Sequence, residues 1–176
     1  MSSRFERISA RREFEGKLFT VYTGVFRHED GGEAQREWVQ HNGAVGVVAH
    51  DGENLYLVRQ PREAVGAPDL LELPAGKLDV EGEAPLETAK RELAEEIGKA
   101  AEHWEPLHRF YSSPGFTNEE VHLFLATGLS DVQRPEVEED ERIDLVVHPL
   151  AGLDALIDEV VDSKTLIGLL ELRRRL

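Results

Sequence analysis

Three glutamates within five positions, Glu92, Glu95 and Glu96, are the residues of this sequence whose spacing most clearly suggests chemistry. On a helix, which turns by about 100° per residue, the three carboxylates would cover an arc of roughly 100°. Carboxylates gathered on one helical turn repel one another unless a cation lies between them. Hard oxygen ligands of this kind suit Mg²⁺ or Mn²⁺. The alternative is an ordinary solvated face, because charged side chains three and four positions apart are common on exposed helices.

The segment that carries these glutamates has the pattern of one amphipathic helix. Its apolar residues recur at helical spacing, and they are Leu86, Ala89, Leu93 and Ile97. Pro85 suits the first turn of such a helix, and Gly98 suits its C-terminal cap. The three acids flank this apolar stripe rather than oppose it, so we expect them to line the edge of a cleft.

The rest of the chain divides into short strand patterns and two further helices. Runs of β-branched and aromatic residues around Gly- and Asp-containing turns indicate two β-hairpins, at residues 17–41 and 44–60. Further strands are predicted at residues 70–76, 104–113, 119–128 and 142–150, and helices at residues 150–163 and 165–176. The arginines at 173–175 lie where cations favour a helix C-terminus. This order of elements indicates mixed α and β structure.

Composition excludes several classes of function. With 176 residues, 40% of them hydrophobic, the chain can bury one good core. The 35 acidic residues against 20 basic ones argue against a nucleic-acid binder and against docking on an anionic membrane surface. The absence of cysteine excludes disulfides, thiol nucleophiles and Cys-ligated zinc. We find no long apolar run of the kind that spans a membrane, and we expect a cytoplasmic protein.

Residues 76–98, GKLDVEGEAPLETAKRELAEEIG, resemble a Nudix box. The family pattern is Gly, five residues, Glu, seven residues, Arg-Glu, an apolar residue, any residue, Glu-Glu, any residue, Gly and an apolar residue. Two positions depart from it, because six residues separate Gly76 from Glu83 and Lys99 replaces the final apolar residue. The longer loop resembles the form found in ADP-ribose pyrophosphatases. Pro114 and the segments VRQPREAVG, LELPAGKLD, YSSPGFTNE and EEDERIDLV resemble the same branch.

This resemblance implies both a fold and a reaction. The fold would be a three-layer α/β/α Nudix sandwich with a mixed sheet at residues 43–176, preceded by a dimerising β-hairpin segment at residues 1–42. The reaction would be Mg²⁺-dependent hydrolysis of ADP-ribose to AMP and ribose 5-phosphate, with Mn²⁺ or another divalent cation as a substitute. The metal ligands implied are the carbonyl of Ala75 and the carboxylates of Glu92, Glu95, Glu96 and Glu141. Arg91 would orient the glutamates, and Glu83 would brace the loop.

A general base is expected from a loop well after the box. Residues 136–143, EVEEDERI, are the candidate, and their spacing matches Glu139 as the base and Glu141 as an additional metal ligand. Other acids between Glu138 and Glu141 stay open for the same role. Without the box, this run would be interpreted as an ordinary acidic surface loop.

The candidate substrate-binding residues are Arg36, Trp38, Arg59, Arg62, Glu72 and Gly115. Either Arg59 or Arg62 could bind a phosphate or ribose through a bidentate contact, and either could instead form a surface salt bridge. Trp38 could stack on adenine or simply pack within a hairpin or a dimer interface.

Three other functions stay open at this point. One is hydrolysis of other nucleoside diphosphate sugars or of dinucleotides, and another is removal of modified nucleoside triphosphates. The third is a non-catalytic sensor that binds ADP-ribose and controls a partner. A homodimer is expected from the resemblance, and the predicted hairpin at 17–41 adds a motive, because an isolated hairpin is marginal in water.

Overall fold

A computed structural model describes residues 4–134 and 142–176 of the chain. Its contacts divide the chain into two compact units. The first unit comprises Met1–Gly43 with Tyr111–Glu120, and the second comprises Ala44–Phe110 with Val121–Leu176. Nothing in the sequence indicated that residues 111–120 belong with the N-terminal segment. Each unit has its own sheet.

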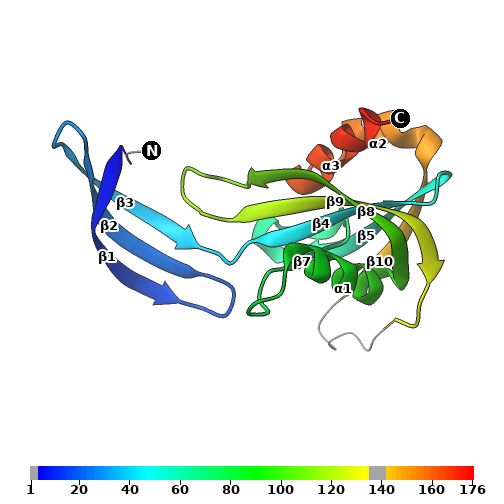
Figure 1. Ribbon diagram of the computed structural model, residues 1–176, viewed down its shortest axis with the longest axis horizontal. Coiled ribbons are helices and arrows are strands. Elements are labelled where there is room, and N and C mark those ends of the chain that lie inside the picture. The colour runs from blue at the N-terminus through cyan, green and yellow to red at the C-terminus, as the bar shows by residue number, and fades with distance from the viewer. Residues whose placement is uncertain (1–3, 135–141) are drawn as a thin grey trace. The chain divides into compact units, whose positions relative to one another are not determined.

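The first unit is built on a three-stranded antiparallel sheet, shown in blue in Figure 1. Its strands are β1 (Phe5–Glu15), β2 (Thr20–His28) and β3 (Glu33–Gln40), in that order. The hairpin of β2 and β3 was predicted, whereas β1 was not. All residues of β1 are exposed, so its sequence lacks the alternation of buried and exposed side chains by which a strand is recognised.

An aromatic cluster covers part of this sheet. The rings of Tyr22 and Trp38 stack with centroids 5.3 Å apart, and Phe26 meets Trp38 edge-on at 5.7 Å. A Cβ at Gly24 would lie 2.3 Å from the carbonyl oxygen of Ser9 and 3.1 Å from the Trp38 ring. Glycine is therefore required at position 24 for the β1 backbone and the Trp38 indole to lie so close to β2.

Residues 111–120 join the first unit through the end of β3. The N–H of Val39 donates to the carbonyl of Phe116 at 2.7 Å, and the N–H of Asn118 donates back to Val39 at 3.4 Å. The side-chain amide of Asn118 also bonds both the N–H and the carbonyl of His41, at 2.8 and 3.2 Å. These bonds hold the loop that contains Gly115 against β3.

The second unit contains a mixed seven-stranded sheet. Strand β4 (Ala44–His50) lies parallel to β9 (Glu120–Asp131) and antiparallel to β5 (Asn54–Arg62). The strand order is β10-β5-β4-β9-β8, with β10 at Asp144–Pro149 and β8 at Lys99–Tyr111. Two short strands lie off this path, β6 (Ala67–Glu72) beside β5 and β7 (Ala75–Lys77) beside β4.

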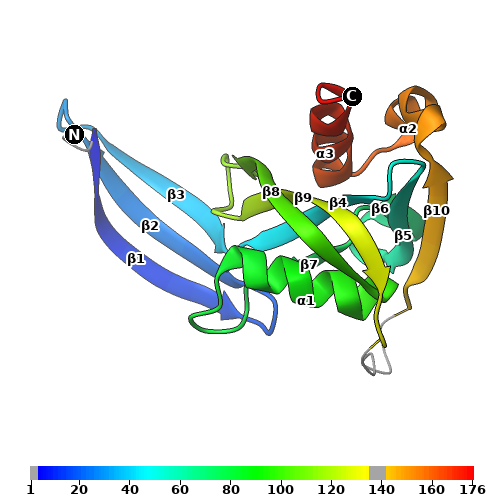
Figure 2. The same cartoon turned by 45° about the vertical axis from the view of Figure 1, so that its right-hand side comes forward.

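Helices cover both faces of this sheet. Helix α1 (Pro85–Ile97) packs on one face, while α2 (Leu153–Glu159) and α3 (Ser163–Arg173) pack on the other (Figures 1 and 2). The two faces follow from alternation along the strands, since Val47 faces α1 and its neighbour Val48 faces the C-terminal helices. Short 3₁₀ turns occur at Glu63–Val65 and Leu150–Gly152. The predicted three-layer α/β/α arrangement is confirmed.

The predicted ends of α1 are confirmed, whereas the C-terminal helices begin and end differently. Pro85 is the first residue of α1, and Gly98 closes it with φ 66°, in the left-handed region. In place of the single helix expected at 150–163, a 3₁₀ turn is followed by α2. Helix α2 ends early because the backbone is extended at Val160, and Asp162 caps α3 instead. No helix within residues 4–134 and 142–176 combines the length and apolar character that a membrane span needs.

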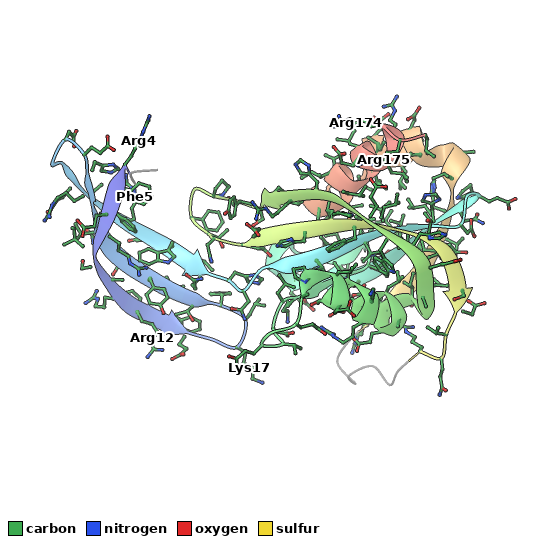
Figure 3. The ribbon with its side chains drawn as sticks, viewed as in Figure 1. Arg4, Phe5, Arg12, Lys17, Arg174 and Arg175 are labelled. Carbon is green, nitrogen blue, oxygen red and sulfur yellow. The ribbon has the colours of Figure 1, made fainter. Side chains whose placement is uncertain are left out.

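The basic C-terminal residues serve the helix that carries them. Arg173 pairs with Asp154 at 2.9 Å. Arg174 and Arg175 (Figure 3) pair with Glu171 one turn earlier, at 2.9 and 2.8 Å. The structure therefore confirms that this cluster is part of the helix terminus.

Candidate active site

The backbone of β7 lies directly against the glutamates of α1, which runs beside it (Figure 2). The N–H of Ala75 donates to Oε2 of Glu96 at 2.9 Å, and Glu96 is only 5% exposed. A Cβ added to Gly76 would lie 2.0 Å from the carboxyl carbon of Glu92. Glycine at position 76 is therefore what allows this carboxylate to lie so close to the strand.

Arg91 supplies the positive charge among these acids. Its Nη1 donates to Glu92 at 2.8 Å and to Glu95 at 2.9 Å, and its Nη2 lies 3.4 Å from Glu83. Although burial disfavours the charged guanidinium, the hydrogen bond to Glu83 and the charges of Glu92 and Glu95 raise the pKa of Arg91 above its ordinary value. The concentration of like charge on α1 is thus partly compensated within the helix itself.

Thr88 fixes the position of Glu83, a role that the sequence did not suggest. Its buried hydroxyl donates to Oε2 of Glu83 at 2.8 Å, the same oxygen that Arg91 approaches. Hydrogen bonds from Thr88 and Arg91 lower the pKa of Glu83. The loop before α1 is therefore tied to the helix through one ionised carboxylate, as expected for a residue that braces the loop.

The donors around β7 have the chemistry that a hard divalent cation requires. Glu92 and Glu96 bring carboxylate oxygens to the Ala75–Gly76 backbone, whose carbonyl is the other predicted ligand. As arranged, the described residues contain no cluster of three acidic or histidine side chains that could hold a metal ion. Glu141, the remaining predicted ligand, lies outside the described residues, as does the predicted base Glu139.

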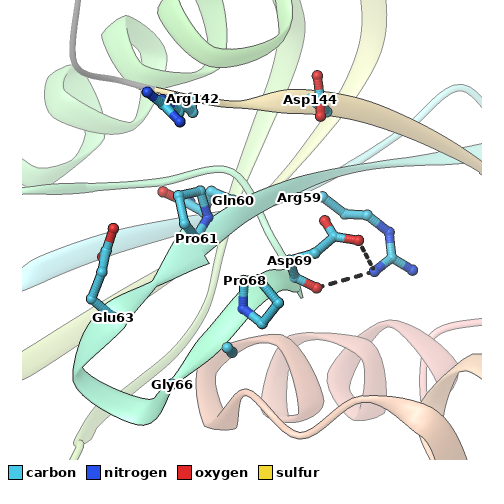
Figure 4. Close-up of a pocket in the computed structure, with 10 residues that line it drawn as sticks. Arg59, Gln60, Pro61, Glu63, Gly66, Pro68, Asp69, Arg142 and Asp144 are labelled. Carbon is cyan, nitrogen blue, oxygen red and sulfur yellow. Dashed lines mark hydrogen bonds and ion pairs between the residues drawn. The ribbon is translucent and has the colours of Figure 1, made fainter.

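The chain on either side of residues 135–141 is anchored in the second unit. The Nε of Arg134 donates to the carbonyl of Glu95 on α1 at 2.6 Å. On the other side, Arg142 lines a cavity of about 660 Å³ beside β5 and β6 (Figure 4). Arg134, the last described residue before this run, therefore contacts the helix that carries the glutamates.

The residue that departs from the box pattern has an evident structural role. Lys99 places its Nζ 2.6 Å from Asp131 and 5.0 Å from the centre of the Tyr56 ring. An ion pair and a cation–π contact there replace the apolar packing that the pattern expects.

Glu72 is the most deeply buried acid of this region, with 1% exposure. Arg62 binds it in bidentate fashion, through Nε at 2.6 Å and Nη2 at 2.9 Å, and the Nζ of Lys164 contacts its Oε2. Although burial disfavours the carboxylate, the hydrogen bond from Arg62 and the charge of Lys164 hold the pKa of Glu72 below its ordinary value. The hydrogen bond to Glu72 and the nearby charge of Glu96 raise the pKa of Arg62.

Arg59 takes part in a different ion pair from Arg62. Its Nη1 lies 3.2 Å from the carboxylate and 3.2 Å from the carbonyl of Asp69, at the wall of the cavity in Figure 4. Gln60 lines the same cavity, and its buried Nε2 finds no hydrogen-bond partner among the described residues.

The other predicted substrate-binding residues lie in the first unit. Arg36 donates to the carbonyl of Gln35 at 2.8 Å, and Trp38 belongs to the aromatic cluster. A Cβ at Gly115 would meet no atom within 4 Å. Their contact with a substrate stays a prediction.

Comparison with known proteins identifies the family. The family model described as NUDIX domain matches residues 40–167. The chain belongs to the Nudix family. This Nudix chain is 42% identical over 171 residues to the ADP-ribose pyrophosphatase of Mycobacterium tuberculosis, covering 94% of the chain and 82% of that relative. It is 38% identical over 174 residues to the methanol dehydrogenase activator of Bacillus methanolicus, covering 96% and 93%. A crystal structure of an ADP compounds hydrolase shares the fold, with a TM-score of 0.86 at 23% identity, covering 98% of this chain and 94% of that one.

The match confirms that the chain is a Nudix hydrolase, and the matched range includes the predicted box at residues 76–98. Sequence reasoning missed two partners of this Nudix site, Thr88 and Lys164. The sequence did offer a signal for the start of the helix that carries Lys164, since Asp162 three positions before Thr165 has the spacing of an N-cap. No such local signal exists for the contact of Lys164 with Glu72, because 92 residues separate them.

Gly76→Ala should reduce the hydrolase rate about a hundredfold, because the new methyl group displaces the Glu92 carboxylate from β7 and small misplacements of catalytic groups are costly. Circular dichroism should show a retained fold. Gly52→Ala is the control, since Gly52 has φ 98° but a Cβ there meets no atom within 4 Å. A Gly76→Ala enzyme as fast as Gly52→Ala would contradict the placement of Glu92.

Proposed function

We propose that this chain is a Mg²⁺-dependent pyrophosphatase that hydrolyses ADP-ribose to AMP and ribose 5-phosphate. The observation that carries the proposal is the 42% identity, over nearly the whole chain, to a relative named ADP-ribose pyrophosphatase. The box carboxylates of Glu92 and Glu96, which lie against Ala75 and Gly76, support it. We place the enzyme in the cytoplasm.

The proposed metal ligands are the Ala75 carbonyl and the carboxylates of Glu92, Glu96 and Glu141, with Glu95 as a further ligand or a neighbour of one. A bound Mg²⁺ or Mn²⁺ would neutralise pyrophosphate oxygens and lower the pKa of the attacking water. Arg91 holds the carboxylates of Glu92 and Glu95 in place through its hydrogen bonds before any cation binds. Glu96 stays aligned through its bond to the N–H of Ala75.

Arg62 is the proposed phosphate ligand. Its bidentate pair with Glu72 fixes the plane of the guanidinium, while 42% of its side chain remains exposed. A planar guanidinium held in this way can present its remaining N–H groups to phosphate oxygens. Arg59 would contribute at the cavity in Figure 4, and Arg36, Trp38 and Gly115 would contact the rest of the substrate.

Glu139 is the proposed general base that takes the proton from the attacking water. Glu139→Gln should lower kcat by at least about a hundredfold, because general-base catalysis commonly contributes that much. The Mg²⁺ concentration for half-maximal rate should stay close to the wild-type value. An unchanged kcat would move the base to Glu138 or Glu141, which the same substitution tests in turn.

Two alternatives remain for the substrate and the role. The same site chemistry would act on other nucleoside diphosphate sugars or on dinucleotides. The relative named methanol dehydrogenase activator favours a second kind of function, in which the chain acts on a partner enzyme rather than as a stand-alone hydrolase.

A substrate panel separates these functions. Purified protein with Mg²⁺ would be assayed against ADP-ribose, ADP-glucose, NADH and a modified dGTP, with release of AMP followed chromatographically. We expect the highest kcat/KM for ADP-ribose. Faster turnover of another compound would reassign the substrate, and no turnover of any would favour the partner-binding role.

We further propose a homodimer in which the strands within residues 17–41 help build the partner subunit's substrate pocket. The exposed apolar side chains of the first unit support this, since burying them against a second copy would remove them from water. They are Phe5, Ile8, Phe14, Leu18 and Phe19, each more than a third exposed.

Sedimentation of the full chain at micromolar concentration should give a dimer. Deletion of residues 1–41 should give a monomer with weak ADP-ribose binding, because the shared pocket is lost. A full-length monomer with undiminished ADP-ribose hydrolysis would contradict the shared site.

A further inference from the structure

The first turn of α3 is bonded to the segment that leads into the candidate metal site. The hydroxyl of Thr165 accepts a hydrogen bond from the N–H of Leu73 at 2.9 Å and donates to Asp162 at 2.6 Å. Asp162 also accepts from the N–H of Thr165 at 2.9 Å, which caps the helix. Leu73 and Thr165 are both fully buried, so water does not compete for these bonds.

The two residues after Leu73 are held just as firmly. The carbonyl of Pro74 accepts from the N–H of Val47 on β4 at 2.8 Å. The N–H of Ala75 donates to Glu96 on α1 at 2.9 Å. Three consecutive residues are therefore bonded to α3, to β4 and to α1 in turn, and the third of them provides the carbonyl proposed as a metal ligand.

A glycine sets how closely α3 approaches this segment. A Cβ at Gly168 would lie 2.6 Å from a methyl group of Leu73 and 2.9 Å from a methyl group of Val48. The helix thus packs with its backbone against the core, one turn after the residues that bond to Leu73. This close packing leaves little freedom for the first turn to shift.

The same turn supplies a second cation to the buried Glu72. Lys164 is 14% exposed, contacts Glu72 through Nζ, and lies 3.0 Å from Asp162. A buried carboxylate is stable only while cations or donors compensate it. If Arg62 also binds a phosphate, Lys164 continues to compensate the negative charge of Glu72.

We propose that Lys164 and Thr165 are positioning residues for the hydrolysis, with Lys164 acting on Arg62 through Glu72 and Thr165 acting on Ala75 through Leu73. This inference rests on the proposed function, in which Arg62 binds a phosphate of the substrate. Neither residue touches the reacting atoms. Each keeps a group that does so in its place, from a helix about seventy residues beyond the box.

A merely structural role would give a different result from a positioning role. Loss of a structural contact lowers the melting temperature and the fraction of active enzyme, which reduces the apparent kcat and leaves KM unchanged. Without the charge of Lys164, Arg62 alone must compensate Glu72 and binds the phosphate less well. Substrate binding is then weaker, and KM rises.

The experiment compares Lys164→Met with Arg173→Met, which removes a cation from the exposed end of the same helix. With ADP-ribose as substrate, Lys164→Met should raise KM about tenfold and change kcat less than about threefold, as expected for the loss of one charge-assisted contact. Arg173→Met should match wild type in both constants. Lys164→Arg, which keeps the charge, should restore most of the wild-type KM.

The Thr165 arm has a different readout. Thr165→Val should raise the Mg²⁺ concentration for half-maximal rate severalfold, because the segment ending at Ala75 loses one of its three bonds, and Thr165→Ser should stay close to wild type. A Thr165→Val enzyme with an unchanged Mg²⁺ requirement would overturn this half of the inference.

An unchanged KM in folded Lys164→Met would overturn the other half. If that variant does not fold, Lys164→Gln replaces it, since its amide can still donate a hydrogen bond to Glu72 but carries no charge. KM should then rise about threefold, and an unchanged KM would again refute the assignment. Wild-type protein without ADP-ribose hydrolysis would refute the proposed function instead, before any variant is made.

Discussion

The close approach of β7 to α1 is the contact on which the candidate site depends. The N–H of Ala75 bonds to Glu96, and the carboxylate of Glu92 lies close against Gly76, which is possible only because position 76 has no side chain. The rest of the second unit serves this contact. Strand β4 bonds to the carbonyl of Pro74, just before β7. The apolar face of α1 packs against the sheet, and this packing places the carboxylates of the helix beside β7.

Charge compensation is the second condition that the structure meets. The acids of α1 repel one another, and Arg91, from the same helix, bridges Glu92 and Glu95. The buried Glu72 is compensated by two cations, Arg62 from β5 and Lys164 from α3. An acidic protein with a net charge of -15 thus places three specific cations beside carboxylates of this region.

Local sequence signals predicted the elements that are amphipathic or clearly capped. Helix α1, its ends at Pro85 and Gly98, and the three-layer arrangement followed from periodicity, capping residues and the family resemblance. Strand β1 escaped because both of its faces are exposed. The break between α2 and α3 was predicted a few residues too late, because the apolar Val160 and Val161 follow α2 and the cap at Asp162 depends on its side-chain hydrogen bonds with Thr165. The networks around Glu72 and Leu73 could not be predicted, since their members lie up to 92 residues apart.

The most direct test of this account is the rate of ADP-ribose hydrolysis by Glu96→Gln across a Mg²⁺ titration, beside Glu102→Gln as a control on the exposed part of β8. The substitution removes a ligand charge at nearly constant shape. We expect Glu96→Gln to lose most turnover at every Mg²⁺ concentration with an unchanged circular dichroism spectrum, and Glu102→Gln to behave as wild type. Wild-type turnover by Glu96→Gln at limiting Mg²⁺ would contradict the assignment of Glu96 as a metal ligand and, with it, the proposed site.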